Sequence, residues 1–246
     1  NGLTTDTLNG PLRAALVCLR HVLSEVRPAI VPWPGVQQVT AVLYADAYFR
    51  LGDTTFRPYN APDRLRGAAN HTMENGWGFV LRVGTFVTYD FGVVPASVVK
   101  HFCSRRAYIF FLEILAQLIP LMTLAVWLPR FWIGFIDNAA GEGALRRGWG
   151  RDEPINNLIA LYTFVSARLG WHSHYERVSS ADNISDKISR QDESLAVALG
   201  WQRAHVPLAA FLDVILLASA DVHQACTSAT CEMLEVSRMF CAAWRR

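Results

Sequence analysis

The stretch Phe131-Trp132-Ile133-Gly134-Phe135-Ile136-Asp137-Asn138 decides the fold of this chain. It is an apolar run of strand length that ends abruptly in an Asp-Asn pair, and three small residues follow. In α/β folds, a buried strand that delivers a carboxylate at its C-terminal tip and then turns into a helix is a common way of placing a functional acid. We therefore predict a strand over Phe131–Ile136 and a short helix over Asn138–Arg147, closed by Gly148.

Three further acids lie in comparable settings. Asp46 follows the apolar run Val39–Ala45, Glu113 lies inside a very apolar helical segment, and Asp186 lies in a short predicted helix. Read singly, an aspartate of this kind is a strand-end, capping or surface residue. Glu113 is harder to explain in that way, because an acid in so apolar a helix needs a partner or a metal ion. Together the four acids suggest a site for divalent cations.

The composition is that of a globular intracellular protein. Of the 246 residues, 52% are hydrophobic and 18% are charged, which is enough apolar material for a packed core and argues against disorder. The net charge of +2 is too small to announce a nucleic-acid partner by itself. Five cysteines without framework spacing predict reduced thiols and a cytoplasmic or nuclear location. The chain does not begin with Met, and we expect it to be a piece of a longer polypeptide.

The order of the predicted elements gives the fold class. Strands are expected first in a group of three, and then alternating with helices. The predicted strands are Val39–Ala45, Gly76–Val83, Gly84–Tyr89, Phe131–Ile136 and His172–Val178, and Tyr48–Asn75 is predicted as a long loop. This order predicts an α/β fold in which a mixed five-stranded sheet, an antiparallel meander plus parallel strands, carries helices on both faces.

This order, with acids at these points, resembles the ribonuclease H fold. More narrowly, it resembles the RNase H-like domain that follows the polymerase in reverse transcriptases of gypsy-type and DIRS-type retroelements. The matching stretches are Tyr44-Ala45-Asp46-Ala47, Gly76-Trp77-Gly78-Phe79-Val80-Leu81, Ile109-Phe110-Phe111-Leu112-Glu113-Ile114-Leu115-Ala116, Phe135-Ile136-Asp137-Asn138, and Asn183-Ile184-Ser185-Asp186-Lys187-Ile188-Ser189-Arg190. The resemblance implies an RNase H-like domain over residues 39–192, preceded by the end of a polymerase region (1–38) and followed by a helical extension (193–246).

The resemblance also implies a site and an activity. Asp46, Glu113, Asp137 and Asp186 match the four metal-binding and catalytic acids of the family. Such a site holds two Mg²⁺ ions, or Mn²⁺ in their place, because hard cations prefer carboxylate oxygens. The implied reaction is hydrolysis of the RNA strand of an RNA/DNA hybrid, and the implied protein partner is the polymerase region of the same polyprotein.

Residues after the Asp137 strand are candidates for supporting this site. Asn138 is expected to assist the acids through hydrogen bonds. Arg146, Arg147 and Arg151 are expected to hold phosphates, and Trp149 to stack on a sugar or base. The same arginines also suit a solvated helix end.

Two rival interpretations stay open at this point. One is the same fold without catalysis, as a nucleic-acid-binding or structural remnant of a decayed element. The other is a membrane-associated protein anchored through Ala107–Leu128, which is long enough to span a bilayer of roughly 30 Å. Glu113, Gln117 and Pro120 argue against a span, because polar groups and a central proline are costly there. We therefore expect no stable membrane association.

Overall fold

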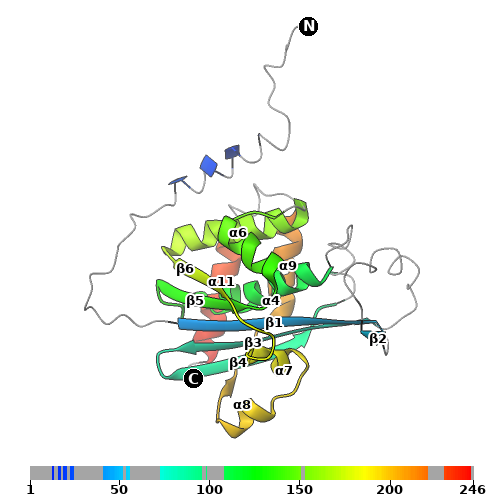
Figure 1. Ribbon diagram of the computed structural model, residues 1–246. Helices are drawn as coiled ribbons and strands as arrows, with labels where there is room; N and C mark the ends of the chain where they lie inside the picture. The colour runs from blue at the N-terminus through cyan, green and yellow to red at the C-terminus, as the bar shows by residue number, and fades with distance from the viewer. Residues whose placement is uncertain are drawn as a thin grey trace, which may run out of the picture.

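A seven-stranded mixed sheet forms the centre of the protein (Figure 1). The computed structural model describes residues 41–51, 54–55, 73–95, 98, 108–150, 153–220 and 230–244, with isolated positions between 13 and 24. The strands are β1 (Ala41–Leu51), β2 (Thr54–Thr55), β3 (Met73–Val83), β4 (Phe86–Val93), β5 (Phe131–Ile136), β6 (His172–Arg177) and β7 (Gln202–Arg203). The helices are α4 (Tyr108–Thr123), α5 (Ala139–Arg147), α6 (Glu153–Leu169), α7 (Ser185–Ser189), α8 (Ser194–Ala198), α9 (Leu208–Ala220) and α11 (Thr230–Trp244).

The sheet has an antiparallel half and a parallel half. Its strand order is β6-β5-β1-β3-β4-β7, and β2 pairs with the end of β1. β1, β3 and β4 form an antiparallel meander, whereas β5 runs parallel to β1 and β6 runs parallel to β5. These five strands are the mixed sheet predicted from the sequence, so the predicted fold class is confirmed. Two strands of two residues each, β2 and β7, are added to it.

Helices cover both faces of the sheet unequally. In Figure 1 the sheet lies between a thick layer that contains α4, α6, α9 and α11 and a thin layer formed by the short α7 and α8. Side chains of β1 alternate accordingly, as a strand requires. Leu43, Ala45 and Ala47 belong to the main core, whereas Tyr44 packs against a smaller cluster around Val80 and Tyr89 on the thin side.

Helix α4 is the central element of the main core. Its residues from Phe110 to Thr123 are all buried, and they pack against β1, β3, α9 and α11. Most of the apolar run that resembled a membrane span, from Tyr108 to Thr123, is therefore an internal helix of 16 residues. Within the described residues, none of the helices combines the length and the apolar character needed to cross a bilayer. Pro120 lies inside α4, and the helix continues to Thr123 beyond it.

Several predicted elements have different ends in the structure. β1 continues to Leu51, so residues 48–51, which were predicted as loop, belong to the strand. The other end of that predicted loop, from Met73 to Asn75, belongs to β3. β4 runs from Phe86 to Val93, later than the predicted Gly84–Tyr89, because residues 84 and 85 form the turn of the hairpin. β1 and β3 are longer than predicted because they pair with each other in register along their full length.

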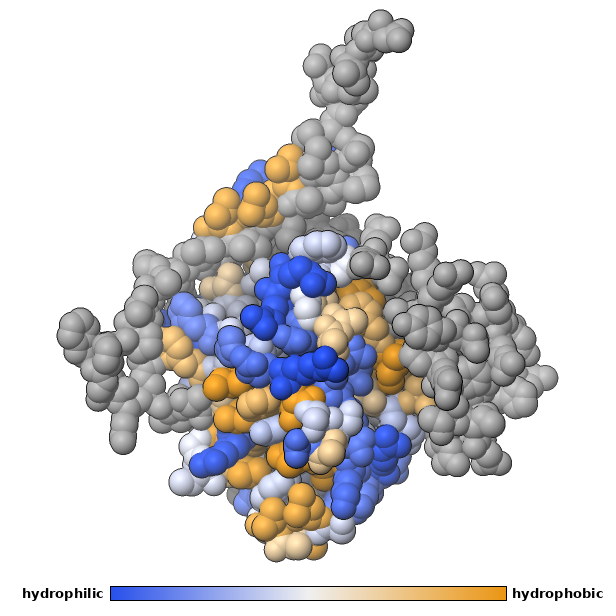
Figure 2. All heavy atoms as spheres, viewed as in Figure 1, coloured by the Kyte–Doolittle hydropathy of each residue, from blue (hydrophilic) through white to orange (hydrophobic). Residues whose placement is uncertain are grey.

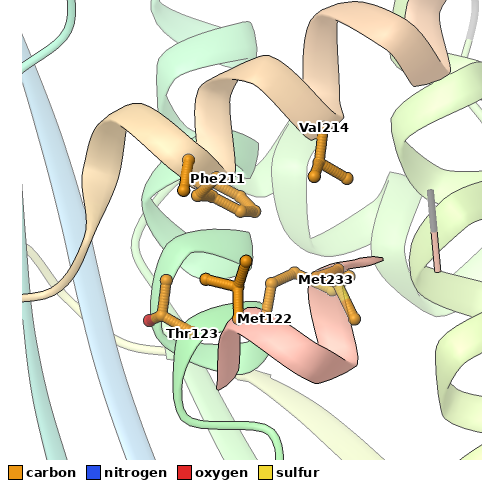
Figure 3. A pocket seen from close by; sticks show the side chains of 7 residues that line it. Met122, Thr123, Phe211, Val214 and Met233 are labelled. Carbon is orange, nitrogen blue, oxygen red and sulfur yellow. The ribbon is translucent and has the colours of Figure 1, made fainter. Parts of the chain in front are cut away.

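The C-terminal region shares the core with the sheet. Phe211, Ile215 and Met233 from α9 and α11 belong to the same apolar cluster as α4. A small gap remains between these three helices, lined by Met122, Phe211 and Met233 among others (Figure 3). It leaves no room for a water molecule, and we regard it as a packing defect rather than a ligand site. The proposed domain limits at residues 38 and 192 stay predictions.

Hydrogen bonds to Asp90 hold the edge strand β7 against β4. Asp90 of β4 is buried, accepts a 3.0 Å hydrogen bond from Arg203 and a 2.7 Å bond from the backbone N–H of Val206, and so anchors β7.

Figure 2 shows hydrophilic residues across the middle of the visible face and an apolar group at its lower edge, where α8 lies. The exposed apolar side chains of that segment are Leu195, Val197 and Leu199.

Candidate functional site

The parallel pairing of β1 and β5 brings two acids together. The last pair of this ladder joins Tyr44 to Phe135, and β5 ends one residue later at Ile136. Two residues beyond that pair, Asp46 and Asp137 reach the same level of the sheet. Asp46 is not at the tip of its strand, as the sequence suggested, because β1 continues along β3 to Leu51. It lies instead where β5 stops and leaves the edge of β1 open.

Helix α4 holds these two strand positions from the core side. Gln117, which is fully buried, donates hydrogen bonds to the carbonyl oxygens of Phe135 (2.8 Å) and Ala45 (3.4 Å). Glu113 lies one helical turn before Gln117, so both side chains leave the same face of α4. The amide thus ties together the chain segments that carry Asp46 and Asp137, at the point toward which Glu113 reaches.

Three carboxylates converge at this point. One oxygen from each of Asp46, Glu113 and Asp137 lies within 4.8 Å of the other two, a spacing that suits a metal ion. Asp46 and Glu113 are only 3% and 4% exposed, whereas Asp137 is half-buried. Oε2 of Glu113 is buried and has no hydrogen-bond partner among the described residues. An unpaired buried carboxylate oxygen is costly without a cation or a proton, so the site has the character of a cation site.

Burial and mutual repulsion shift the ionisation of these acids. Burial raises the pKa of Asp46 from 3.8 to about 7; the Ser189 hydroxyl partly opposes this, and the charges of Asp137 and Asp186 add to it. Burial also raises the pKa of Glu113 well above its ordinary value, and the nearby charge of Asp46 raises it further. A divalent cation reverses both effects, because it favours the ionised carboxylates.

Asp186 lies beside this cluster but outside its closest group. It is in the first turn of α7, and its charge contributes to the raised pKa values of both Asp46 and Glu113. Its carboxylate forms an ion pair with Arg190, one turn later, with Nη2 3.0 Å from Oδ1. The structure therefore brings three of the four predicted acids into mutual contact range and places the fourth next to them, paired with an arginine.

Two serines bind the acids. Ser189, which is fully buried at the end of α7, donates a 2.7 Å hydrogen bond to Oδ2 of Asp46. Ser180, in the exposed loop before α7, donates a 2.9 Å bond to Oδ2 of Asp137. Neither role was predicted from the sequence. Ser189 belongs to one of the stretches that resemble the family, but a serine in a sequence gives no sign of which distant acid it will meet.

Asn138 caps the helix that follows Asp137. Its side-chain oxygen accepts hydrogen bonds from the backbone N–H groups of Ala140 and Gly141, each at 3.0 Å, and so caps α5. A capping oxygen satisfies donors that a helix start leaves unpaired. The residue therefore fixes the turn that follows Asp137, and it supports the acid through the backbone rather than through a hydrogen bond to a carboxylate.

The predicted nucleic-acid contacts lie at the far end of α5. Arg146 and Arg147 are exposed; Arg146 pairs with Glu142 at 2.8 Å, and the guanidinium of Arg147 lies 5.3 Å from the ring centre of Trp149. Trp149 is 54% exposed. Nine helical residues at about 1.5 Å each place this group roughly 13 Å from Asp137. Arg151 lies outside the described residues.

Comparisons with known proteins find little in common with this chain. No protein-family model and no curated sequence matches it. Among solved structures, an N-terminal RNase H domain from Mycobacterium tuberculosis, fused to maltose-binding protein, has a TM-score of 0.38 at 15% identity, over 66% of this chain and 99% of that one. NurA with manganese has a TM-score of 0.21 at 11% identity, over 91% of this chain and 60% of that one. Neither likeness is close enough to bear on function, which must rest on the arrangement of the acids.

Proposed function

We propose that this protein is a metal-dependent nuclease that hydrolyses the RNA strand of RNA/DNA hybrids. We further propose that it belongs to the reverse transcriptase polyprotein of a retroelement. The observation that carries the first proposal is the convergence of Asp46, Glu113 and Asp137 from three separate elements, β1, α4 and the end of β5. Buried acids so close together destabilise a metal-free fold, which argues for a functional reason to keep them.

The donor set fits a hard divalent cation. All of the converging groups are carboxylates, and oxygen ligands of this kind suit Mg²⁺ and Mn²⁺ rather than softer metals. When bound in pairs, such ions activate a water and stabilise the leaving oxygen of a phosphodiester. We propose two ions, held by the three converging acids together with Asp186, whose side chain would have to exchange its ion pair with Arg190 for a place in the site.

Other residues of the chain would orient the acids and bind the nucleic acid. Ser189 and Ser180 each fix one oxygen of an acid, which leaves other lone pairs of Asp46 and Asp137 for the ions. Arg147 and Trp149 are suited to hold a phosphate and a sugar or base some distance along the strand. In an A-like hybrid, recognition would depend on backbone shape and 2′-hydroxyl groups.

The retroelement context rests on the resemblance of five short stretches, with the site acids in the same order along the chain. In this context the natural partner is the polymerase region of the same polyprotein, residues 1–38 would form the link to it, and the protein would act in the cytoplasm or nucleus. Loss of catalysis during decay of the element is the main rival, since it would leave the same fold.

The test is a comparison of substrates and metals. A labelled RNA/DNA hybrid, single-stranded RNA and duplex DNA are incubated with the protein and Mg²⁺, Mn²⁺ or EDTA. The proposal predicts cutting of the hybrid alone, in its RNA strand, with either ion and none with EDTA. Cutting of duplex DNA would support a nuclease of another specificity. A folded protein that cuts nothing would support the inactive remnant.

A further inference from the structure

Helix α7 lies unusually close to the sheet at two glycines of β3. A Cβ atom built on Gly78 would lie 2.6 Å from Cα of Ser189 and 2.7 Å from the carbonyl carbon of Ile188. One built on Gly76 would lie 2.6 Å from the carbonyl oxygen of Ser189. These atoms belong to the backbone of α7 and cannot turn aside as a flexible side chain would. A larger residue at Gly78 would therefore push the helix away from the sheet, and one at Gly76 would meet the ring of Tyr48 as well as the helix.

The strand alternation shows why glycine occurs twice with a tryptophan between. Gly76 and Gly78 face α7, whereas Trp77 points to the opposite side and is buried in the main core. Figure 1 shows α7 beneath β3 and β4, on the thin side of the sheet. The stretch Gly76-Trp77-Gly78 therefore serves two layers, filling the core on one face and leaving space for a helix backbone on the other.

The register of the sheet connects this space to the acid cluster. Gly78 is the cross-strand partner of Asp46, and Gly76 is the partner of Tyr48. The absent side chain of Gly78 thus leaves a place directly beside Asp46 on the same face of the sheet. Ser189 fills that place, and its buried hydroxyl lies 2.7 Å from Oδ2 of Asp46.

The same hydroxyl also touches the segment that carries the fourth acid. Its oxygen lies 2.8 Å from the backbone carbonyl oxygen of Asp186, one turn earlier in α7. A serine hydroxyl has one hydrogen to donate, so it chooses between this carbonyl and Asp46. An ionised Asp46 attracts it more strongly, because hydrogen bonds to a charged acceptor are the stronger ones.

We propose that Ser189 is a positioning residue, seated by Gly78, that holds the Asp46 carboxylate in the orientation used for metal binding and keeps α7, with Asp186, against the site. The importance for metal binding rests on the proposed function; the contact between Ser189 and Asp46 does not. Gly78 acts only indirectly, through Ser189, because it provides the space that Ser189 occupies.

The first experiment compares Ser189→Ala with Ser185→Ala. Ser185 is a matched control, because it is also fully buried in α7 but donates its hydroxyl hydrogen to Asn183. Mn²⁺ affinity is measured by calorimetry at several pH values. Ser189→Ala should weaken it about 10-fold or more, as loss of a group that orients a metal ligand commonly does. It should also move the pH midpoint of binding upward, because the hydroxyl lowers the pKa of Asp46. Ser185→Ala should change neither.

A second pair of variants tests whether the space left by Gly78 is needed to place Ser189 beside Asp46. Gly78→Ala should weaken Mn²⁺ binding at least as much as Ser189→Ala, because the added methyl group displaces α7. Gly92→Ala is the control, since the three atoms nearest to a Cβ there belong to the indole of Trp77, at 3.0–3.1 Å, and not to α7. Equal affinities for the wild type, Ser189→Ala and Gly78→Ala would overturn the proposal.

A metal-free measurement separates this proposal from the proposed function. The ionisation of Asp46 is followed by carbon NMR in wild type and Ser189→Ala. A higher pKa in the variant, with no Mn²⁺ binding by wild type, would refute the metal site and retain the contact that positions Asp46. An unchanged pKa in a protein that does bind Mn²⁺ would refute the role of Ser189 and retain the metal site.

Discussion

The side-chain amide of Gln117 donates a 2.8 Å hydrogen bond to the carbonyl oxygen of Phe135, two residues before Asp137. The same amide reaches the carbonyl oxygen of Ala45, immediately before Asp46. A single buried side chain of α4 therefore fixes the spacing of the two strands at the level of the acids. This contact holds the chain segments before Asp46 and Asp137 together at the level of α4 from which Glu113 reaches the site.

Replacement of Gln117 by Met should affect both stability and the site. The side chain is similar in length, but the carbonyl oxygen of Phe135 loses its donor, which should lower the free energy of unfolding by about 1–3 kcal/mol. Mg²⁺ affinity should fall as well. Thr123→Val is the control, since Thr123 is also buried in α4 and its side-chain hydroxyl donates to the carbonyl oxygen of Ile119 in the same helix. Urea unfolding and metal titration of both variants give the comparison. Equal Mg²⁺ affinity in both would argue that the hydrogen bonds of Gln117 do not support the metal site.

The sequence predicted the parallel half of the fold well. The strand Phe131–Ile136 has the predicted ends, and the helix after it begins one residue later than predicted, at Ala139, because Asn138 is its cap; Asn138 and Gly148 are strong local start and stop signals. β1 was predicted too short, because its pairing with β3 beyond Asp46 is a non-local interaction that no local pattern reveals. Ser189 was missed as a partner of Asp46 for the same reason: 143 residues separate them.

The raised pKa of Asp46 should make the metal-free protein less stable as the pH rises. The folded-state pKa of about 7 exceeds the ordinary 3.8, so the folded state retains a proton that the unfolded state loses. The resulting contribution to stability is present below pH 3.8 and is lost as the pH rises through about 7. At about 1.4 kcal/mol per pH unit the loss is at most roughly 4 kcal/mol.

Asp46→Asn isolates this effect, because it removes the ionisation and little else. With EDTA present, the variant should be more stable than wild type at pH 8, and the difference should shrink as the pH falls toward 4. Urea unfolding at a series of pH values measures it. A stability difference that stays constant across this range would contradict the raised pKa.

Glu113→Gln should remove stabilisation by metal without harming the metal-free fold. The buried glutamate has an oxygen without a partner among the described residues, so the neutral amide should be tolerated when EDTA is present. At a Mg²⁺ concentration about 100 times the Kd, wild type should gain about 2.7 kcal/mol, and the variant should gain almost nothing.

A control for Glu113→Gln is Glu142→Gln. Glu142 lies close by in α5 but pairs with Arg146, outside the acid cluster. The control should lose little stability and should keep the full Mg²⁺ effect, which thermal unfolding with and without the ion can show. A Glu113→Gln protein that Mg²⁺ stabilises as much as wild type would remove this residue from the metal site.

Arg147→Ala should weaken binding of an RNA/DNA hybrid and make it less sensitive to salt. If Arg147 neutralises one phosphate, its loss should reduce the slope of log K against log salt by about 1. Arg82→Ala is the control, because Arg82 is an exposed arginine on β3 that donates to the carbonyl oxygen of Gly84 in the hairpin turn. Fluorescence anisotropy at several salt concentrations measures both; identical slopes for the two variants would place the nucleic acid elsewhere.

The most direct test of the central claim is cleavage of an RNA/DNA hybrid by wild type beside Asp137→Asn and Asp182→Asn. Asp137 belongs to the acid cluster, whereas Asp182 is an exposed acid in the loop before α7. Wild type and Asp182→Asn should cut the RNA strand with Mg²⁺ and not with EDTA, and Asp137→Asn should not cut under either condition. Cutting that survives in Asp137→Asn, or its absence from folded wild type, would contradict a catalytic metal site at these acids.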